Sequence, residues 1–326
     1  MSIFGNMAQI RGKQRNTMEK GRNSSIGYIL TLIGGICWGF SGTCGQNLFM
    51  NKNASSPWLV PIRMIGAGII LIIFMSFREK GRVLDIWRDR RDICRIIIFG
   101  ILGIFSSQFT YFTTIEYSNA GIATVLQYLG PALIMLYVCI TEKRRPLKYE
   151  ITALICSIAG VFIIATHGNF RSFAIPKEAL FWGILSAISL LIYTVFPEKL
   201  IRRHSTPVVV GWGMLIGGIV SFFMFRPWKM DVIVDGETIF FLIVIIVVGT
   251  VLAYTFYMIG VEKIGPEKAS MIACVEPVSA TVFSALWLKS KFVPLDILGF
   301  VLILSTVFII TLNKSKKEQG YIENKK

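Results

Sequence analysis

The sequence predicts an all-α membrane protein: ten transmembrane helices in two inverted five-helix repeats, with both termini cytoplasmic. Composition is the first reason, because the 326-residue chain is 54% hydrophobic, only 16% charged and has a mean hydropathy of +0.63. The second reason is that its apolar segments recur at about 20 residues, the length that crosses a bilayer. The third is that Lys and Arg gather in alternate loops.

Ten segments are long and apolar enough to cross the hydrocarbon as helices, in which every backbone polar group is bonded internally. We predict them at 27–48, 57–77, 94–115, 119–140, 150–167, 178–197, 207–226, 238–260, 267–288 and 295–313. The first is too long for a signal peptide, although basic residues precede it, and more spans follow. We expect cytoplasmic tails at 1–26 and 314–326, with no folded structure in the first.

Orientation follows from the loops, because short segments rich in Lys and Arg stay on the cytoplasmic side. With the N-terminus inside, 26 of the 34 Lys and Arg residues fall in cytoplasmic tails and loops. The outer loops hold Lys52, Arg171, Lys177, Arg226, Lys229, Lys289 and Lys291. The formal charge of +15 is therefore explained by anionic membrane lipid, and no soluble basic domain exists to bind nucleic acid.

Five spans is an odd number, so a second copy of a five-helix unit must enter the membrane upside down. We place the two repeats at 27–167 and 178–313. At an offset of 150, the residues Pro57, Val60, Met64, Gly68 and Ile69 match Pro207, Val210, Met214, Gly218 and Ile219. At an offset of 146, the residues Gly103, Tyr111, Glu116, Ala123 and Pro131 match Gly249, Tyr257, Glu262, Ala269 and Pro277. Inverted repeats of this kind are typical of secondary transporters.

Three features over residues 27–313 resemble one known family. They are the Trp38-Gly39 pair, Pro57 followed by Arg63, and the stretch YFTTIEYSNAGIATVLQYLGPALIMLYVCITEKRRP with its counterpart FYMIGVEKIGPEKASMIACVEP. The family is the drug/metabolite transporter superfamily, in particular its EamA-type permeases with ten spans in two inverted halves. Its members often end the fourth and ninth spans with Glu; Glu142 fits, whereas the ninth span ends Leu288-Lys289-Ser290.

Two charged side chains lie inside predicted spans, where an ionisable group costs about 2.5–3.5 kcal/mol and calls for a reason. Glu276 lies close to the bilayer midplane. It either binds a cationic substrate group or a coupling proton, or it is a protonated or hydrogen-bonded Glu between helices. Arg63 lies nearer the outer end of its span; it either snorkels to the interface or faces a central cavity and holds a carboxylate. Their repeat partners, Gly130 and Gly213, carry no charge.

Further candidates for substrate contact are polar and aromatic side chains near the middle of the spans. They are Trp38, Gln46, Gln108, Tyr111, Gln127, Tyr128, Tyr254 and Tyr257. Gln, Tyr and Trp supply hydrogen bonds and apolar walls to an amphipathic solute, although each can equally serve helix packing. Pro131 and Pro277 occupy matching places and are expected to kink their helices, at the binding site or as tolerated packing features.

The sequence offers little for catalysis. It has no phosphate-binding Gly-Lys loop, only two histidines, and six cysteines without metal-ligand spacing. We therefore predict no cofactor, no metal site and no enzyme activity, and we expect transport to be driven by gradients.

We interpret the chain as a permease of a bacterial cell membrane in which one five-helix half rocks against the other around a midplane site. The resemblance implies a small organic metabolite or drug as substrate, an amino acid or related compound above all, with proton-coupled export or exchange. An intramembrane lipid-modifying enzyme with Glu276 as base, or a non-transporting sensor, is the alternative. The chain is a monomer or a homodimer through its peripheral fifth and tenth spans.

Overall fold

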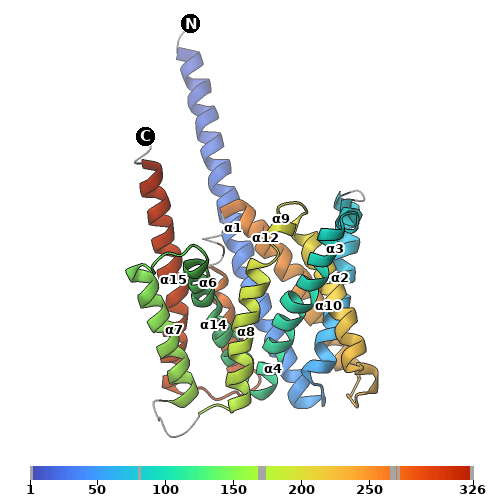
Figure 1. Ribbon diagram of the computed structural model, residues 1–326. Coiled ribbons are helices and arrows are strands. Elements are labelled where there is room, and N and C mark those ends of the chain that lie inside the picture. The colour runs from blue at the N-terminus through green and yellow to red at the C-terminus, as the bar shows by residue number, and fades with distance from the viewer. Residues whose placement is uncertain (1–2, 80–81, 168–173, 265–268, 270–271, 324–326) are drawn as a thin grey trace.

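The structure is a computed structural model, and it describes residues 3–79, 82–167, 174–264, 269 and 272–323 (Figure 1). Within these ranges every regular element is helical. Side chains are described only between residues 25 and 309. The all-helical class predicted from composition is therefore the class observed.

The helices follow one another through short loops. Those that run through the bundle are α1 (Ile3–Asn51), α2 (Ser56–Glu79), α3 (Arg90–Ile98), α4 (Ser106–Tyr117), α5 (Ala120–Gln127), α6 (Gly130–Thr141), α7 (Lys148–Thr166), α8 (Lys177–Val195), α10 (Thr206–Phe225), α11 (Gly236–Ile243), α12 (Ala253–Ile264), α14 (Val275–Leu286) and α15 (Pro294–Glu323). The short elements are η1 (Arg82–Trp87), η2 (Phe99–Phe105), α9 (Glu198–Ile201), η3 (Pro227–Lys229) and η4 (Val244–Leu252).

Eight helical runs among the described residues are long and apolar enough to cross a membrane. They correspond to the first eight predicted spans. Two shorter apolar helices, Val275–Leu286 and Pro294–Ile309, stand at the places of the last two. Part of the predicted span 267–288 lies outside the described residues. The chain is thus a multi-pass membrane protein.

The first helix is longer than predicted. Residues 3–26, for which we expect no folded structure, continue α1 as one helix, and α15 likewise runs on to Glu323 (Figure 1). The physical reason is that an apolar span provides the helical nucleus, and adding residues to an existing helix costs far less than starting one. Neither extension contains proline to stop it. The extensions leave the bundle from the same end, which we call the terminal face; the other end is the opposite face.

The most extensive contact between described elements is that of α2 with α10. A Cβ added at Gly68 would lie 2.8 Å from the backbone nitrogen of Leu215, and one at Gly218 would lie 2.9 Å from that of Ile65. The two glycines thus let the backbones touch. The contact is reciprocal, because Gly218 lies 150 residues after Gly68 and Leu215 lies 150 residues after Ile65.

Two long spans contain π-helical segments, and two others are interrupted. The segments η2 and η4 are π-helical, a geometry in which a residue bonds the carbonyl five positions earlier. The fourth span breaks at Tyr128 and Leu129 between α5 and α6, and a turn at Cys274 precedes α14. Both breaks lie just before the prolines for which we predicted kinks, because proline fits the first turn of a helix better than its interior.

Ion pairs close the bundle at both faces. At the opposite face, Lys52 Nζ lies 2.7 Å from Asp235 and 2.6 Å from Glu237; we call this the opposite-face joint. At the terminal face, Arg203 lies 2.9 Å from Asp89 and 3.0 Å from Asp92; we call this the terminal-face joint. Asp235 and Asp89 are also the N-caps of α11 and α3, respectively. Each joint connects a loop of one half to a helix start of the other.

The opposite-face joint predicts a pH dependence of stability. The Lys52 ammonium, and then the Thr238 N–H, hold the pKa of the Asp235 carboxyl well below its ordinary value. A carboxyl with a depressed pKa stabilises the fold above its unfolded pKa, about 4, and this contribution is lost as the pH falls towards the folded value. Asp235→Asn should therefore lower the melting temperature at pH 7, and the gap to the wild type should narrow progressively below about pH 4.

Thermal unfolding of the purified protein in detergent measures this gap. The matched control is Glu198→Gln, because Glu198 belongs to an exposed pair with Arg202 on a single helical turn, and such pairs contribute little. A gap for Asp235→Asn that stays constant down to about pH 3 would contradict the assignment.

Candidate functional site

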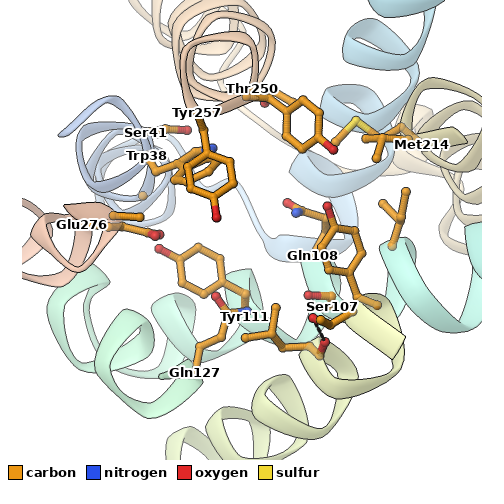
Figure 2. A pocket seen from close by; sticks show the side chains of 18 of the residues that line it. Trp38, Ser41, Ser107, Gln108, Tyr111, Gln127, Met214, Thr250, Tyr257 and Glu276 are labelled. Carbon is orange, nitrogen blue, oxygen red and sulfur yellow. Dashed lines mark hydrogen bonds between the residues drawn. The ribbon is translucent and has the colours of Figure 1, made fainter. Parts of the chain in front are cut away.

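A cavity of about 480 Å³ lies inside the bundle. Its wall is formed by side chains from α1, α2, α4, α5, α8, α10, α12 and α14 (Figure 2). Pro197, Ile201 and Thr206 line it near the terminal face, whereas Arg63 and Phe112 lie at its other end, well inside the bundle. The cavity therefore extends from the middle of the protein towards the terminal face. Its size suits a small organic molecule.

Nine of the ten side chains predicted for substrate contact line this cavity. They are Trp38, Arg63, Gln108, Tyr111, Gln127, Tyr128, Tyr254, Tyr257 and Glu276. They come from six different spans and from both halves of the chain. Pro131 also lines the cavity, whereas Pro277 does not. The structure thus brings together residues that are more than 200 positions apart in sequence.

Glu276 points into the cavity from the first turn of α14 (Figure 2). Its contact with the Tyr128 hydroxyl is long, at 3.5 Å, because that hydroxyl donates at 3.0 Å to the carbonyl oxygen of Ala273. Among the described residues no cation lies within ion-pair distance of the Glu276 carboxylate. The carboxylate is therefore available to a proton or to a cationic group of a ligand.

Arg63 lies at the far end of the cavity, and its side chain does not reach for the membrane surface. The residue is only 6% exposed, its Nε donates to Thr250 Oγ1 at 3.0 Å, and its guanidinium lies 4.8 Å from the centre of the Phe112 ring. The contact with Phe112 has cation–π geometry. Within the described part of the chain the two terminal nitrogens have no hydrogen-bond partner. They can therefore bind a carboxylate in the cavity.

Thr250 holds Arg63 in place through the π-helical geometry of η4. Its hydroxyl donates to the carbonyl oxygen of Ile245, five residues earlier, at 2.9 Å, and accepts from Arg63. The hydroxyl thus uses its donor and its acceptor at once. Thr250 was not among the predicted site residues. The one feature of the sequence that could have indicated it is its lone hydroxyl in the apolar run IVIIVVGTVL.

Ser41 is a second polar residue of the wall that the predicted site did not include. Its hydroxyl is buried and has no hydrogen-bond partner among the described residues, and it touches η4 where Gly249 leaves room. A Cβ at Gly249 would lie only 2.1 Å from both Cβ and Oγ of Ser41. The glycine therefore allows α1 to approach η4 closely, which brings Trp38 and Ser41 to the cavity.

Aromatic side chains form much of the remaining wall. The rings of Trp38 and Tyr257 are 5.2 Å apart, and Tyr257 points into the same space as Glu276 (Figure 2). The Tyr111 hydroxyl shares a hydrogen bond of 2.9 Å with Thr124. Gln127 donates to Ser186 at 2.8 Å. These contacts hold the side chains of Trp38, Tyr111 and Gln127 in position on the cavity wall.

Gln46 does not line the cavity. Its amide oxygen accepts from the Ala120 N–H at 3.0 Å and from Ser284 at 2.9 Å, and its nitrogen donates to Ser290 at 2.9 Å. These partners connect α1 to the start of α5 and the end of α14, near the opposite face. In this conformation Gln46 is a link between helices that helps to close that face.

The chain is similar to a family of transporters and to individual bacterial transporters. A family model described as the EamA-like transporter family matches residues 25–166 and 177–312. The chain is 38% identical over 294 residues to the uncharacterised inner membrane transporter YicL of Salmonella typhimurium, covering 90% of this chain and 98% of that one. It is 20% identical to the uncharacterised transporter YetK of Bacillus subtilis, over 80% of this chain and 79% of the relative.

One solved crystal structure is similar in fold. It shares 20% sequence identity and a TM-score of 0.57, over 89% of this chain and 96% of its own. At that identity the likeness concerns the arrangement of the helices alone.

The contact of Gly249 with Ser41 predicts a rescue. Gly249→Ala should lower stability by about 1–3 kcal/mol, because the new methyl group forces α1 away from η4. Ser41→Gly removes the two atoms it would meet, so Gly249→Ala should cost much less in that background. Thermal unfolding of the four proteins of this double-mutant cycle measures the coupling. Additive effects of the two substitutions would show that the contact between Gly249 and Ser41 does not set how closely α1 approaches η4.

Proposed function

The chain belongs to the EamA-like transporter family, and we propose that it is a secondary active transporter that moves a small organic solute by alternating access. The observation that carries the proposal is the cavity, whose wall holds both Glu276 and Arg63 without an ion pair between them. We place the protein in a bacterial plasma or inner membrane, because a similar protein is named as an inner membrane transporter.

The proposed architecture has ten spans, an inverted repeat and cytoplasmic termini. Helix contacts support the repeat, because α10 packs against η2 as α2 packs against η4, and η2 and η4 begin 145 residues apart. Both termini leave the same face, as an even number of spans requires (Figure 1). We assign that face to the cytoplasm because the Lys-rich and Arg-rich segments lie there.

The two charges favour an amino acid or a related compound as substrate. Arg63 offers free guanidinium nitrogens to a carboxylate, and Glu276 offers a carboxylate to an ammonium group. The rings of Trp38, Tyr128 and Tyr257 provide a wall for an apolar or aromatic side chain. A zwitterion with an apolar body would satisfy all three parts of the site.

Proton coupling is proposed for Glu276. A carboxylate near the midplane that is not held by a strong partner can exchange a proton for a cationic substrate, and that competition links the two fluxes. The cavity extends towards the terminal face and is closed towards the opposite face by Gln46 and its partners. This arrangement corresponds to one of the two states that alternating access requires.

Glu276→Gln should abolish substrate-dependent proton movement, because the amide cannot take up a proton. The assay is proton flux in proteoliposomes with pools of amino acids and cationic drugs. Glu262→Gln is the matched control, since Glu262 is an exposed carboxylate on α12, and it should leave the flux unchanged. Flux that survives Glu276→Gln would make this residue structural, and no flux with any pool would argue against proton-coupled transport of these solutes.

Thr250→Val should raise KM for a carboxylate-bearing substrate about tenfold, equivalent to about 1.4 kcal/mol, and leave kcat nearly unchanged. The reason is that valine keeps the size of threonine but removes the acceptor that orients the Arg63 guanidinium. Thr250→Ser keeps the hydroxyl and should restore KM. An amide analogue of the same substrate should show no such difference, and an equal loss for both ligands would contradict a role through Arg63.

A further inference from the structure

The two joints are related by the internal repeat. Asp89 and Asp235 are 146 residues apart, the offset of the second repeat window, and both begin a helix as N-cap residues. Lys52 lies in the four-residue loop 52–55, between α1 and α2. The loop 202–205, between α9 and α10, is of equal length and lies 150 residues later; its Arg203 is one position beyond the counterpart of Lys52. The joints therefore occupy equivalent places in the two halves and lie at opposite faces of the bundle.

Each joint contains a charge that is shielded from solvent. The Lys52 side chain is 11% exposed and its two carboxylate partners lie on either side of the start of α11. In the terminal-face joint Asp92 is 1% exposed and is also contacted by His204 at 3.0 Å. Opening the opposite-face joint would leave the shielded Lys52 ammonium without its two carboxylate partners, which is costly. Opening the terminal-face joint would leave the buried Asp92 with Arg95 of its own helix, at 3.6 Å, in place of three partners.

Neighbouring contacts reinforce both joints. At the opposite face the Ile233 N–H donates to the Lys52 carbonyl oxygen at 3.0 Å, and Asn53 donates to the Asp231 carbonyl oxygen at 2.7 Å. At the terminal face Trp212 donates to the Val83 carbonyl oxygen at 2.8 Å and packs edge to face on Trp87. The first set joins the loop before α2 to the segment before α11, and the second joins η1, between α2 and α3, to α10.

A gate contact is made on the closed side of a transporter and broken on the open side. The cavity extends towards the terminal face, where Pro197, Ile201 and Thr206 line it, yet the terminal-face joint is closed. The opposite-face joint is closed as well. Both ion pairs are present in the same conformation. A fixed connection would be present in every conformation, whereas gates at the two faces would alternate.

We propose that both joints stay closed throughout transport and unite α2, α3–α4, α10 and α11–α12 into one frame shared by the two halves. Access to the cavity then changes through α5–α6 and α14, the helices interrupted beside the cavity. Tyr128 at one interruption bonds the Ala273 carbonyl oxygen at the other, so the two are connected. This inference rests on the proposed function, because it presumes that the cavity opens to both faces. It replaces rocking of one five-helix half against the other.

The test locks the opposite-face joint and asks whether the cavity still opens there. Gln108→Cys, on the cavity wall, is the reporter in a variant that lacks the six native cysteines, all of which are free thiols. In oriented proteoliposomes a carbodiimide joins Lys52 to Asp235 or Glu237 through an amide bond, which mass spectrometry identifies. The readout is the rate at which a membrane-impermeant maleimide, added at the opposite face, labels the reporter.

Lys52→Arg is the matched control, because arginine keeps the ion pair but a carbodiimide does not couple it to a carboxylate. We expect cross-linked protein and treated Lys52→Arg protein to label at the same rate, within about twofold. Labelling that is about tenfold or more slower in the cross-linked protein would overturn the proposal, since the joint would then have to open.

A second variant decides the question even where labelling is slow. Lys52→Met breaks the joint; in a fixed frame it lowers the melting temperature without raising the labelling rate from the opposite face. A gate would behave differently, and a rise of about tenfold or more would overturn the proposal. Both measurements use accessibility, not flux. A failure to find a transported substrate would therefore count against the proposed function, whereas the labelling rates would still decide whether the joint opens.

Discussion

The structure depends on one constraint: the hydrocarbon core of a membrane offers no hydrogen-bond partner to a backbone N–H or C=O group. Regular helices satisfy this constraint and π-helical segments keep their own backbone bonds, while at an interruption or a widened turn a side chain can add a bond to a carbonyl oxygen. The departures in this protein lie at the cavity. Thr250 bonds the Ile245 carbonyl oxygen within η4, and Tyr128 bonds the Ala273 carbonyl oxygen beside the break before α14. Thr250 and Tyr128, which bond these carbonyl oxygens, thus also line the cavity.

Each charged residue of the site is present at only one of its two repeat-related positions, and packing explains how. Arg63 of the first half corresponds to Gly213 of the second by the offset of 150, and Thr250 of the second half corresponds to Ile104 of the first by the offset of 146. A Cβ at Gly213 would lie 2.7 Å from the Ile104 side chain, so isoleucine occupies the space that the arginine would need. At Gly130, the counterpart of Glu276, Leu190 fills the space in the same way. A glycine and an isoleucine thus stand in place of the Arg63–Thr250 pair, and an apolar side chain occupies the space beside the counterpart of Glu276.

Length, hydropathy and the placement of charges were enough to predict the helical class and the main spans, because the bilayer constrains these directly. Side-chain type and depth were enough to choose nine side chains that line the cavity, out of ten predicted for substrate contact. Other features depend on contacts between distant segments and leave little trace in one sequence. Gln46 looked like a ligand contact but bonds Ala120 and Ser284 instead, and Thr250 gained its role only through η4 and Arg63. The joints were equally hidden, since loop charges on their own indicate orientation and no partner.

The proposed division into a frame and moving helices places the two cavity charges on different parts of the protein. Arg63 and Thr250 belong to the frame, whereas Glu276 belongs to α14 and its neighbour Tyr128 to the break after α5. When α5–α6 and α14 move, the distance between the guanidinium and the carboxylate changes, and the Arg63–Thr250 bond does not. A solute that bonds both charges therefore binds one geometry better than the other. Only such a difference in affinity allows a ligand to shift a conformational equilibrium, so occupancy and access are coupled by the placement of these charges.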